Sequence, residues 1–155
     1  MSQEMRPKDY MELGILYVRE GRFDEAFRAL RQAMFRYTEQ SGHELPYPLM
    51  SYYGLCLVVL HQDPPRGLAL CKRAVDEAGN RAEFYWNLGK AFLAMRRKAQ
   101  AITAFQHGLQ IGDDPRLVSE LRRLGIRNQP LIPFLSRENI LNRYLGILRA
   151  KSKAA

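Results

Sequence analysis

The sequence has few of the residues that build reactive or membrane-spanning structures. It holds only two cysteines and three histidines, and neither cysteine stands at metal-ligand spacing from the other or from a histidine. The longest apolar run covers about residues 52–60, far short of the roughly 20 residues that span a bilayer. The N-terminus lacks the apolar core of a secretory signal. We therefore expect a cytoplasmic protein with no metal site and with Cys56 and Cys71 reduced in the core.

Motifs of catalysis and cofactor binding are also missing. The sequence contains no G-x-x-x-x-G-K-[ST] loop, no G-x-G-x-x-G after a strand and no G-x-S-x-G elbow. No stretch shows a convincing strand pattern. Acidic pairs such as Asp24-Glu25 and Asp113-Asp114 fall at predicted helix ends, where capping and solvation explain them. The sequence thus predicts no catalytic residue, no cofactor and no enzymatic activity.

The positive charge is distributed unevenly. Residues 1–95 carry twelve Lys/Arg and twelve Asp/Glu, whereas residues 96–155 carry twelve and four, so the whole excess of +8 lies in the last part. Arginine provides 18 of the 24 basic residues, and its guanidinium suits bidentate contact with carboxylate or phosphate. Two interpretations stay open: a surface for an anionic partner, either nucleic acid or an acidic membrane, or solvated helix ends and a tail.

One pattern of apolar and small residues occurs three times. The pattern is centred on a glycine. An aromatic residue stands four positions before this glycine, a leucine one position before it and a second aromatic residue three positions after it. Small or apolar residues follow at twelve, sixteen and nineteen positions after the glycine. Around Gly89 these are Tyr85, Leu88, Phe92, Ala101, Phe105 and Gly108. Around Gly14 they are Tyr10, Leu13, Tyr17, Ala26, Leu30 and Ala33. Around Gly54 they are Met50, Tyr53 and Leu57, then, one residue late, Gly67, Cys71 and Ala74.

This pattern resembles the tetratricopeptide repeat, a helix-turn-helix unit of about 34 residues. The resemblance implies an all-α fold, a right-handed superhelical array of three hairpins. The repeats are expected at residues 7–40, 47–81 (a degenerate copy) and 82–115, with a solvating helix at 115–125 that covers the last repeat. The glycines are expected where the two helices of a hairpin cross, because small residues let helix axes approach to about 8–10 Å.

Proline and aspartate predict where several elements begin. Asp63-Pro64 and Asp114-Pro115 are typical helix starts, with Asp as the cap and Pro in the first turn. Residues 39–48 contain Gly and two Pro, and we expect a loop there.

The C-terminal part, residues 126–155, is expected to hold an extended Pro-containing segment and an amphipathic helix at about 137–149. This helix could cap the array, lie in its groove or pair with a second copy to form a homodimer. We expect a single structural domain overall.

The register of the family assigns three positions of each first helix to the concave side. They are Met11, Ile15 and Val18; Ser51, Leu55 and Val58; Trp86, Lys90 and Leu93. Eight of the nine are uncharged, so we expect an apolar groove that binds a protein segment, most simply an amphipathic helix. Trp86 is the sharpest candidate, because Tyr85 beside it already fills the structural aromatic position. The alternative is that Trp86 packs under the C-terminal segment.

Some members of the family hold a peptide's terminal carboxylate with a clamp of Lys, Asn and Arg. The corresponding positions here are Met11, Ile15, Tyr52, Glu83 and Asn87, and none has the residue type that the clamp requires at its own place. The resemblance therefore implies a non-enzymatic adaptor, scaffold or small chaperone whose protein or peptide ligand is not held by such a clamp. Binding of an anionic partner through the basic last third is the alternative function.

Overall fold

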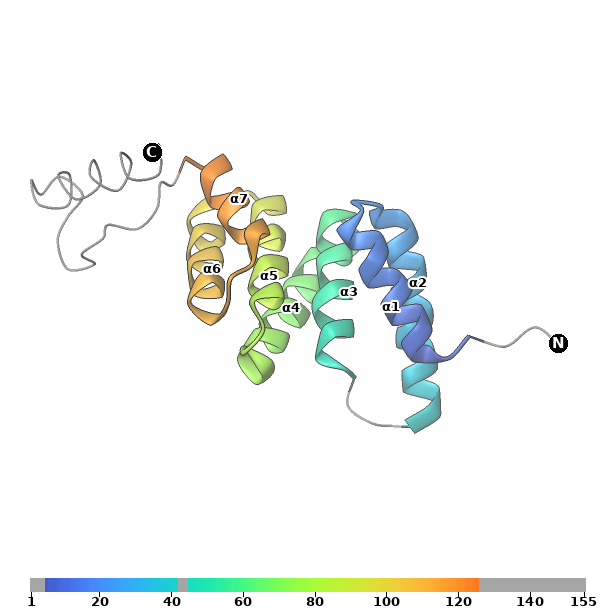
Figure 1. Ribbon diagram of the computed structural model, residues 1–155. Helices are drawn as coiled ribbons and strands as arrows, with labels where there is room; N and C mark the ends of the chain where they lie inside the picture. Colours follow the sequence, from blue (N-terminus) through green and yellow to red (C-terminus); the bar gives the residue numbers. More distant parts are fainter. Residues whose placement is uncertain (1–4, 42–44, 126–155) are drawn as a thin grey trace, which may run out of the picture. The chain divides into compact units, whose positions relative to one another are not determined.

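A computed structural model describes residues 5–41 and 45–125 of the chain, and within them the fold is all-α (Figure 1). The helices are α1 (Pro7–Arg19), α2 (Phe23–Ser41), α3 (Tyr47–Val59), α4 (Pro64–Ala78), α5 (Ala82–Ala94), α6 (Lys98–Ile111) and α7 (Pro115–Arg123). The chain divides into two units, Met1–Leu124 and Gly125–Ala155, and these helices belong to the first. The expectations for residues 126–155, and with them the single domain, lie outside the described residues and stay predictions.

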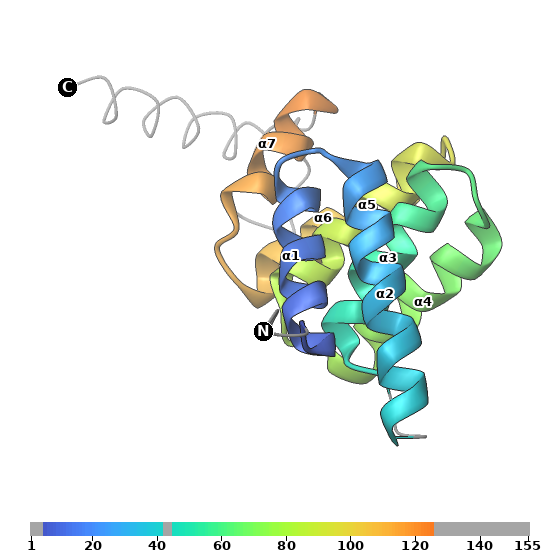
Figure 2. The same cartoon turned by 90° about the vertical axis from the view of Figure 1, so that its right-hand side faces the viewer.

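The helices pack as three consecutive hairpins. α1 packs on α2, α3 on α4 and α5 on α6, while α3 also contacts α2 and α5, and α5 contacts α4. α7 packs on α6. Seen from the α1–α2 side, these two helices lie in front of the others (Figure 2). The predicted all-α array of helical hairpins is confirmed.

Glycines allow the close crossing of the paired helices. A Cβ at Gly14 would stand 2.5 Å from Cγ of Leu30 and 3.3 Å from the carbonyl oxygen of Ala26, both in α2. A Cβ at Gly54 would meet the carbonyl oxygen of Gly67 in α4 at 2.6 Å. A Cβ at Gly89 would meet the ring of Phe105 in α6 at its Cε1 atom. All three glycines therefore lie at helix crossings, as the sequence predicted.

The turns inside the hairpins share one conformation. α1 and α2 are separated by three residues, as are α5 and α6, whereas α3 and α4 are separated by four. The second residue of each turn is left-handed: Gly21 at φ 76°, His61 at φ 54° and Arg96 at φ 59°. The extra residue expected in the second hairpin is therefore present.

The loop predicted at residues 39–48 is shorter than expected. α2 continues to Ser41 and α3 begins at Tyr47. Pro46 is the N-cap of α3 and Pro48 lies in its first turn. Proline is tolerated there because those N–H groups have no partner within the helix, so Pro46 and Pro48 lie at the start of α3 and not inside the loop.

The two Asp-Pro starts are confirmed. A side-chain oxygen of Asp63 accepts a hydrogen bond from the backbone N–H of Arg66 at 3.2 Å, at the start of α4. Asp114 accepts one from the N–H of Arg116 at 2.9 Å, at the start of α7. Each cap satisfies an N–H that the first helical turn leaves without a partner.

Candidate functional site

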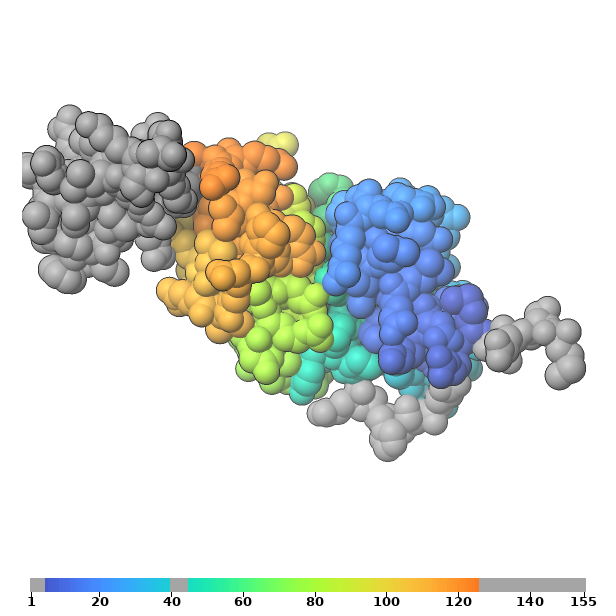
Figure 3. Space-filling model, in the orientation of Figure 1, coloured from blue at the N-terminus to red at the C-terminus, as the bar shows by residue number. Residues whose placement is uncertain are grey.

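α3 is enclosed on every side. All residues from 49 to 58 are buried, because α3 lies between the hairpins and packs against α1, α2, α4 and α5. In the space-filling view α3, in teal, shows only as a narrow strip between α1 in blue and the green and orange of α5 and α7 (Figure 3). A helix that is apolar all round suits such a central place.

This enclosure changes the expected groove. Six of the nine residues assigned to it are buried and three are half-buried. The buried ones are Met11, Val18, Ser51, Leu55, Val58 and Trp86. The half-buried ones are Ile15, Lys90 and Leu93. Ser51, Leu55 and Val58 are at most 1% exposed, so a partner reaches the outer helices of this face before it reaches α3. The role of the nine residues in binding stays a prediction.

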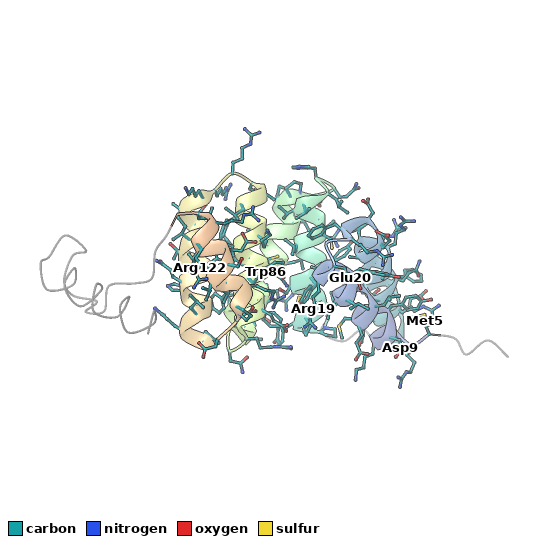
Figure 4. All side chains as sticks on the ribbon, turned by 45° about the horizontal axis from the view of Figure 1, so that its top comes forward. Met5, Asp9, Arg19, Glu20, Trp86 and Arg122 are labelled. Atoms are coloured by element: carbon teal, nitrogen blue, oxygen red, sulfur yellow. The ribbon has the colours of Figure 1, made fainter. Side chains whose placement is uncertain are left out.

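Trp86 is covered by cations. The guanidinium carbon of Arg116, from α7, lies 4.8 Å from the centre of the indole ring, and Nζ of Lys90 lies 5.7 Å from it. Lys90 in turn donates a hydrogen bond of 2.8 Å to Oε1 of Glu120 in α7. These contacts leave Trp86 9% exposed. Figure 4 shows Trp86 beside α7, on the same side of the helices as Arg19 of α1.

Two polar atoms in this cluster have no hydrogen-bond partner among the described residues. They are Nε1 of Trp86 and Oε2 of Glu120, and both are buried. The guanidinium of Arg123 lies 3.9 Å from Oε2 of Glu120, beyond hydrogen-bond distance. Leaving a buried donor or acceptor unpaired costs about 1–3 kcal/mol, so this face keeps hydrogen-bonding capacity that the described helices do not use.

A second polar cluster joins α1, α3, α5 and α7. Glu83 Oε2 accepts a hydrogen bond of 3.2 Å from the Tyr52 hydroxyl and lies 3.6 Å from the Arg19 guanidinium; Arg81 pairs with its other oxygen. Burial and the nearby Glu83 carboxylate raise the pKa of Tyr52. At the start of α7, the guanidinium of Arg116 pairs with Asp114 at 2.6 Å. The face predicted to be apolar therefore carries several charges at its edges.

Three of the five positions that correspond to a carboxylate clamp form hydrogen bonds inside the protein. Tyr52 bonds Glu83, and the side-chain amide of Asn87 donates a 2.9 Å hydrogen bond to Oγ of Ser51. Both Asn87 and Ser51 are fully buried. These contacts agree with the expectation that no clamp ligand binds, which stays a prediction.

The sequence analysis missed the contribution of α7. Arg116 and Glu120 were assigned to a solvating helix, yet the Arg116 side chain reaches Trp86 and the neighbourhood of Tyr52, and the Glu120 side chain reaches Lys90. A signal was present: Glu120 follows Trp86 by one 34-residue period. If α7 is treated as the first helix of a fourth repeat, the register assigns Glu120 to the same repeat position as Trp86.

Residues 5–41 and 45–125 contain no group of three or more His, Cys, Asp or Glu that could hold a metal ion. No helix within these ranges is both long enough and apolar enough to cross a membrane.

The third hairpin identifies the family. Residues 82–111 match the model of the tetratricopeptide repeat. The chain contains a tetratricopeptide repeat (TPR). The match covers the hairpin α5–α6, and the other two hairpins share its packing and its turn conformation.

Solved structures agree with this fold at low sequence identity. The first TPR of Spaghetti (RPAP3) bound to an HSP90 peptide is 18% identical, with a TM-score of 0.56, and the match covers 79% of this chain and 93% of that one. The first TPR domain of human RPAP3 is also 18% identical, with a TM-score of 0.56, and the match covers 77% of this chain and 89% of that one. MamA is 15% identical, with a TM-score of 0.51, and the match covers 96% of this chain and 80% of that one. A comparison with curated protein sequences found no match.

Tetratricopeptide repeats in general mediate protein–protein interaction and are not enzymes. The stacked hairpins of this TPR protein therefore provide a scaffold for a protein or peptide partner. The identities to the solved structures are low enough that they show the fold alone.

Proposed function

We propose that this TPR protein is a non-enzymatic adaptor that binds a segment of another protein on the face formed by α1, α3, α5 and α7. We call this surface the first-helix face. The binding residues are proposed to centre on Trp86, with Lys90, Leu93 and Ile15 around it.

The observation that carries the proposal is the state of Trp86. Its ring is almost enclosed, yet its N–H has no acceptor among the described residues. A carbonyl or carboxylate from a partner would supply that acceptor if the exposed part of Arg116, whose side chain is 32% exposed, moved aside. Tryptophan is also the residue type that most often anchors a protein interface.

The surroundings of Trp86 suggest the chemistry of the bound segment. Ile15 and Leu93 are half-buried apolar side chains, and Arg19, Lys90 and Arg116 add positive charge at the edges. An amphipathic segment, helical as the sequence suggested, would lay its apolar side on Trp86 and Leu93. Acidic residues on such a segment would meet the cations.

The proposal is tested by affinity capture from the native host with the full chain. We expect a partner that is retained by the wild type, lost with Trp86→Ala and weakened about tenfold with Trp86→Phe, which keeps the ring surface but removes the N–H. Ile111→Ala is the matched control, because Ile111 is an exposed apolar residue at the far end of α6.

Binding can then be measured directly with the identified partner. Trp86 is the only tryptophan of the chain, so its fluorescence reports contact at this face. Capture that is equal for wild type and Trp86→Ala, or a partner that leaves the Trp86 emission unchanged, would contradict the proposal.

A further inference from the structure

One end of the third hairpin gathers exposed cations from two segments of the sequence. α5, α6 and α7 run in alternating directions, so the α5–α6 turn and the last turn of α7 lie at the same end (Figure 1). This end carries Arg96, Arg97, Lys98, Arg122 and Arg123, all of them exposed. We call these five residues the basic end.

The basic end is poorly neutralised. Among the described residues, the basic end takes part in one ion pair, between Arg123 and Glu120 at 3.9 Å. The carboxylate of Glu120 is already bound to Lys90 at 2.8 Å. The equivalent turn of the first hairpin differs, because Arg22 is paired there with Glu20 at 3.0 Å and Glu25 at 3.1 Å. The second turn, with His61 and Asp63, has no such cluster of cations.

The same turn departs from what local stability favours. Lys98 is the first residue of α6, which has no acidic residue in its first turn, so its charge meets the positive end of the helix dipole. Arg97 occupies the N-cap without a side-chain hydrogen bond. Arg96 has a left-handed backbone conformation, and the equivalent position of the first hairpin is occupied by glycine, Gly21. Such departures concentrate at functional sites.

We propose that the basic end binds the phosphate backbone of nucleic acid. Four of its five residues are arginine, whose guanidinium pairs with phosphate in bidentate geometry. The large apolar residues that are exposed in the described ranges lie elsewhere: Met5, Leu16, Phe35 and Ile111. The basic end thus offers no apolar anchor for a protein interface and no side chain to insert into a bilayer, where charge alone gives weak attachment.

The same composition determines the mode of binding. The basic end has no exposed aromatic residue on which an unpaired base could stack. Contact is therefore with phosphates and is independent of sequence, so duplex DNA and RNA bind alike and affinity falls steeply with salt.

The test is fluorescence anisotropy of the full chain with a labelled DNA duplex of about 20 base pairs, a length that spans several phosphates on each strand. Wild type is expected to bind at low salt. The variant Arg97→Gln/Lys98→Gln/Arg122→Gln is expected to lower the slope of log affinity against log salt by about three, and to weaken binding on the order of a hundredfold at about 0.1 M salt.

A matched control removes the same charge elsewhere. Arg28→Gln/Arg31→Gln/Lys72→Gln replaces three exposed cations of α2 and α4 and should retain most of the affinity; circular dichroism verifies that both variants are folded. Equal losses in the two variants, no binding by wild type at low salt, or binding to phosphatidylserine vesicles but not to the duplex would each overturn the proposal. Trp86→Ala should bind DNA like wild type, so the outcome is independent of the adaptor function.

Discussion

Gly54 and Gly67 face each other where α3 crosses α4. A Cβ at Gly67 would lie 2.5 Å from the carbonyl oxygen of Gly54, and a Cβ at Gly54 would lie 2.6 Å from that of Gly67. The other two repeats have alanine, Ala26 and Ala101, at the position of Gly67, so the sequence alone indicates that the second repeat is a degenerate copy. In the structure, α3 and α4 approach closely because neither Gly54 nor Gly67 has a side chain.

We therefore predict that Gly67→Ala, although it restores the family residue, destabilises the protein by about 1–3 kcal/mol, the usual cost of overpacking a tight contact. Urea unfolding followed by circular dichroism measures the change. Gly112→Ala is the control, because its Cβ would have 3.7 Å to the nearest atom and the stability should change little. A Gly67→Ala protein as stable as wild type would show that α3 and α4 can separate freely.

The two cysteines are also defined at the scale of single residues. Both are fully buried and free, and Sγ of Cys71 lies 3.3 Å from the carbonyl oxygen of Ser51. Burial raises the pKa of Cys56 from 9.0 to about 12 and raises the pKa of Cys71 as well. The thiolate, which is the reactive form, is thereby suppressed in the folded protein.

We predict that neither thiol reacts with a chromogenic disulfide reagent in the native protein at pH 8, and that both react when urea unfolds it. Since the folded pKa of Cys56 lies above the unfolded value, its contribution to stability is complete below about pH 9 and is lost as the pH rises toward 12. The denaturation midpoint should fall over that interval. A Cys56→Ala/Cys71→Ala variant, compared with its own midpoint at pH 8, should show a smaller fall.

At the scale of elements, α3 and α5 are joined by a buried polar pair. The Asn87 amide donates to Oγ of Ser51 at 2.9 Å, both residues are fully buried, and Oδ1 of Asn87 has no partner in the described part of the chain. Two helices that met only through apolar side chains could slide along each other with little penalty. One hydrogen bond in an apolar contact favours a single register, because every other register leaves both groups unpaired.

A double-mutant cycle tests this role. Ser51→Ala leaves the Asn87 amide unpaired and is expected to cost about 1–3 kcal/mol. Asn87→Leu combined with Ser51→Ala removes both partners and should be less destabilising than the sum of the single changes, measured by thermal unfolding. Strict additivity would mean that the hydrogen bond contributes nothing to the contact of α3 with α5. Ser119→Ala, at an exposed serine of α7, provides the matched control.

At the scale of the whole described unit, charged groups connect helices that are distant in sequence. Arg19 of α1 reaches Glu83 of α5, and Tyr52 of α3 is bonded to the same carboxylate. The Arg116 guanidinium holds the pKa of Asp114 below its ordinary value, and Arg19 contributes in the same direction. First and last helices therefore share one electrostatic environment.

This environment predicts a dependence of global stability on pH. A carboxyl whose folded pKa is lowered stabilises the fold above its unfolded pKa, near 3.8 for Asp114, and loses that contribution as the pH falls through the folded value. Asp114→Asn keeps the cap but not the charge. We expect it to be less stable than wild type by under about 1 kcal/mol at pH 6, with the difference shrinking below pH 4 in thermal unfolding; a constant difference would assign the effect to capping alone.

The sequence by itself determined the array. Two local signals indicate the array: the spacing of Gly14, Gly54 and Gly89, and the Asp-Pro helix starts. These signals can be interpreted without knowledge of the fold, because each hairpin repeats the same packing with its neighbour. They located the helix crossings and two of the helix starts, but α2 continues to Ser41 and α3 begins at Tyr47, both inside the loop predicted at residues 39–48.

The tertiary structure alone decided what the first-helix face presents. Register assigned Ser51, Leu55 and Val58 to it, but how far a residue is covered depends on the helices around it, and α3 is enclosed. The contacts of charged side chains also depend on segments that are far apart in the sequence. Arg116 contacts Trp86 and Glu120 contacts Lys90 only in the folded protein, and two short basic stretches form the basic end only there. Periodicity records which face of a helix a residue occupies, whereas distance between faces is fixed only when the hairpins stack.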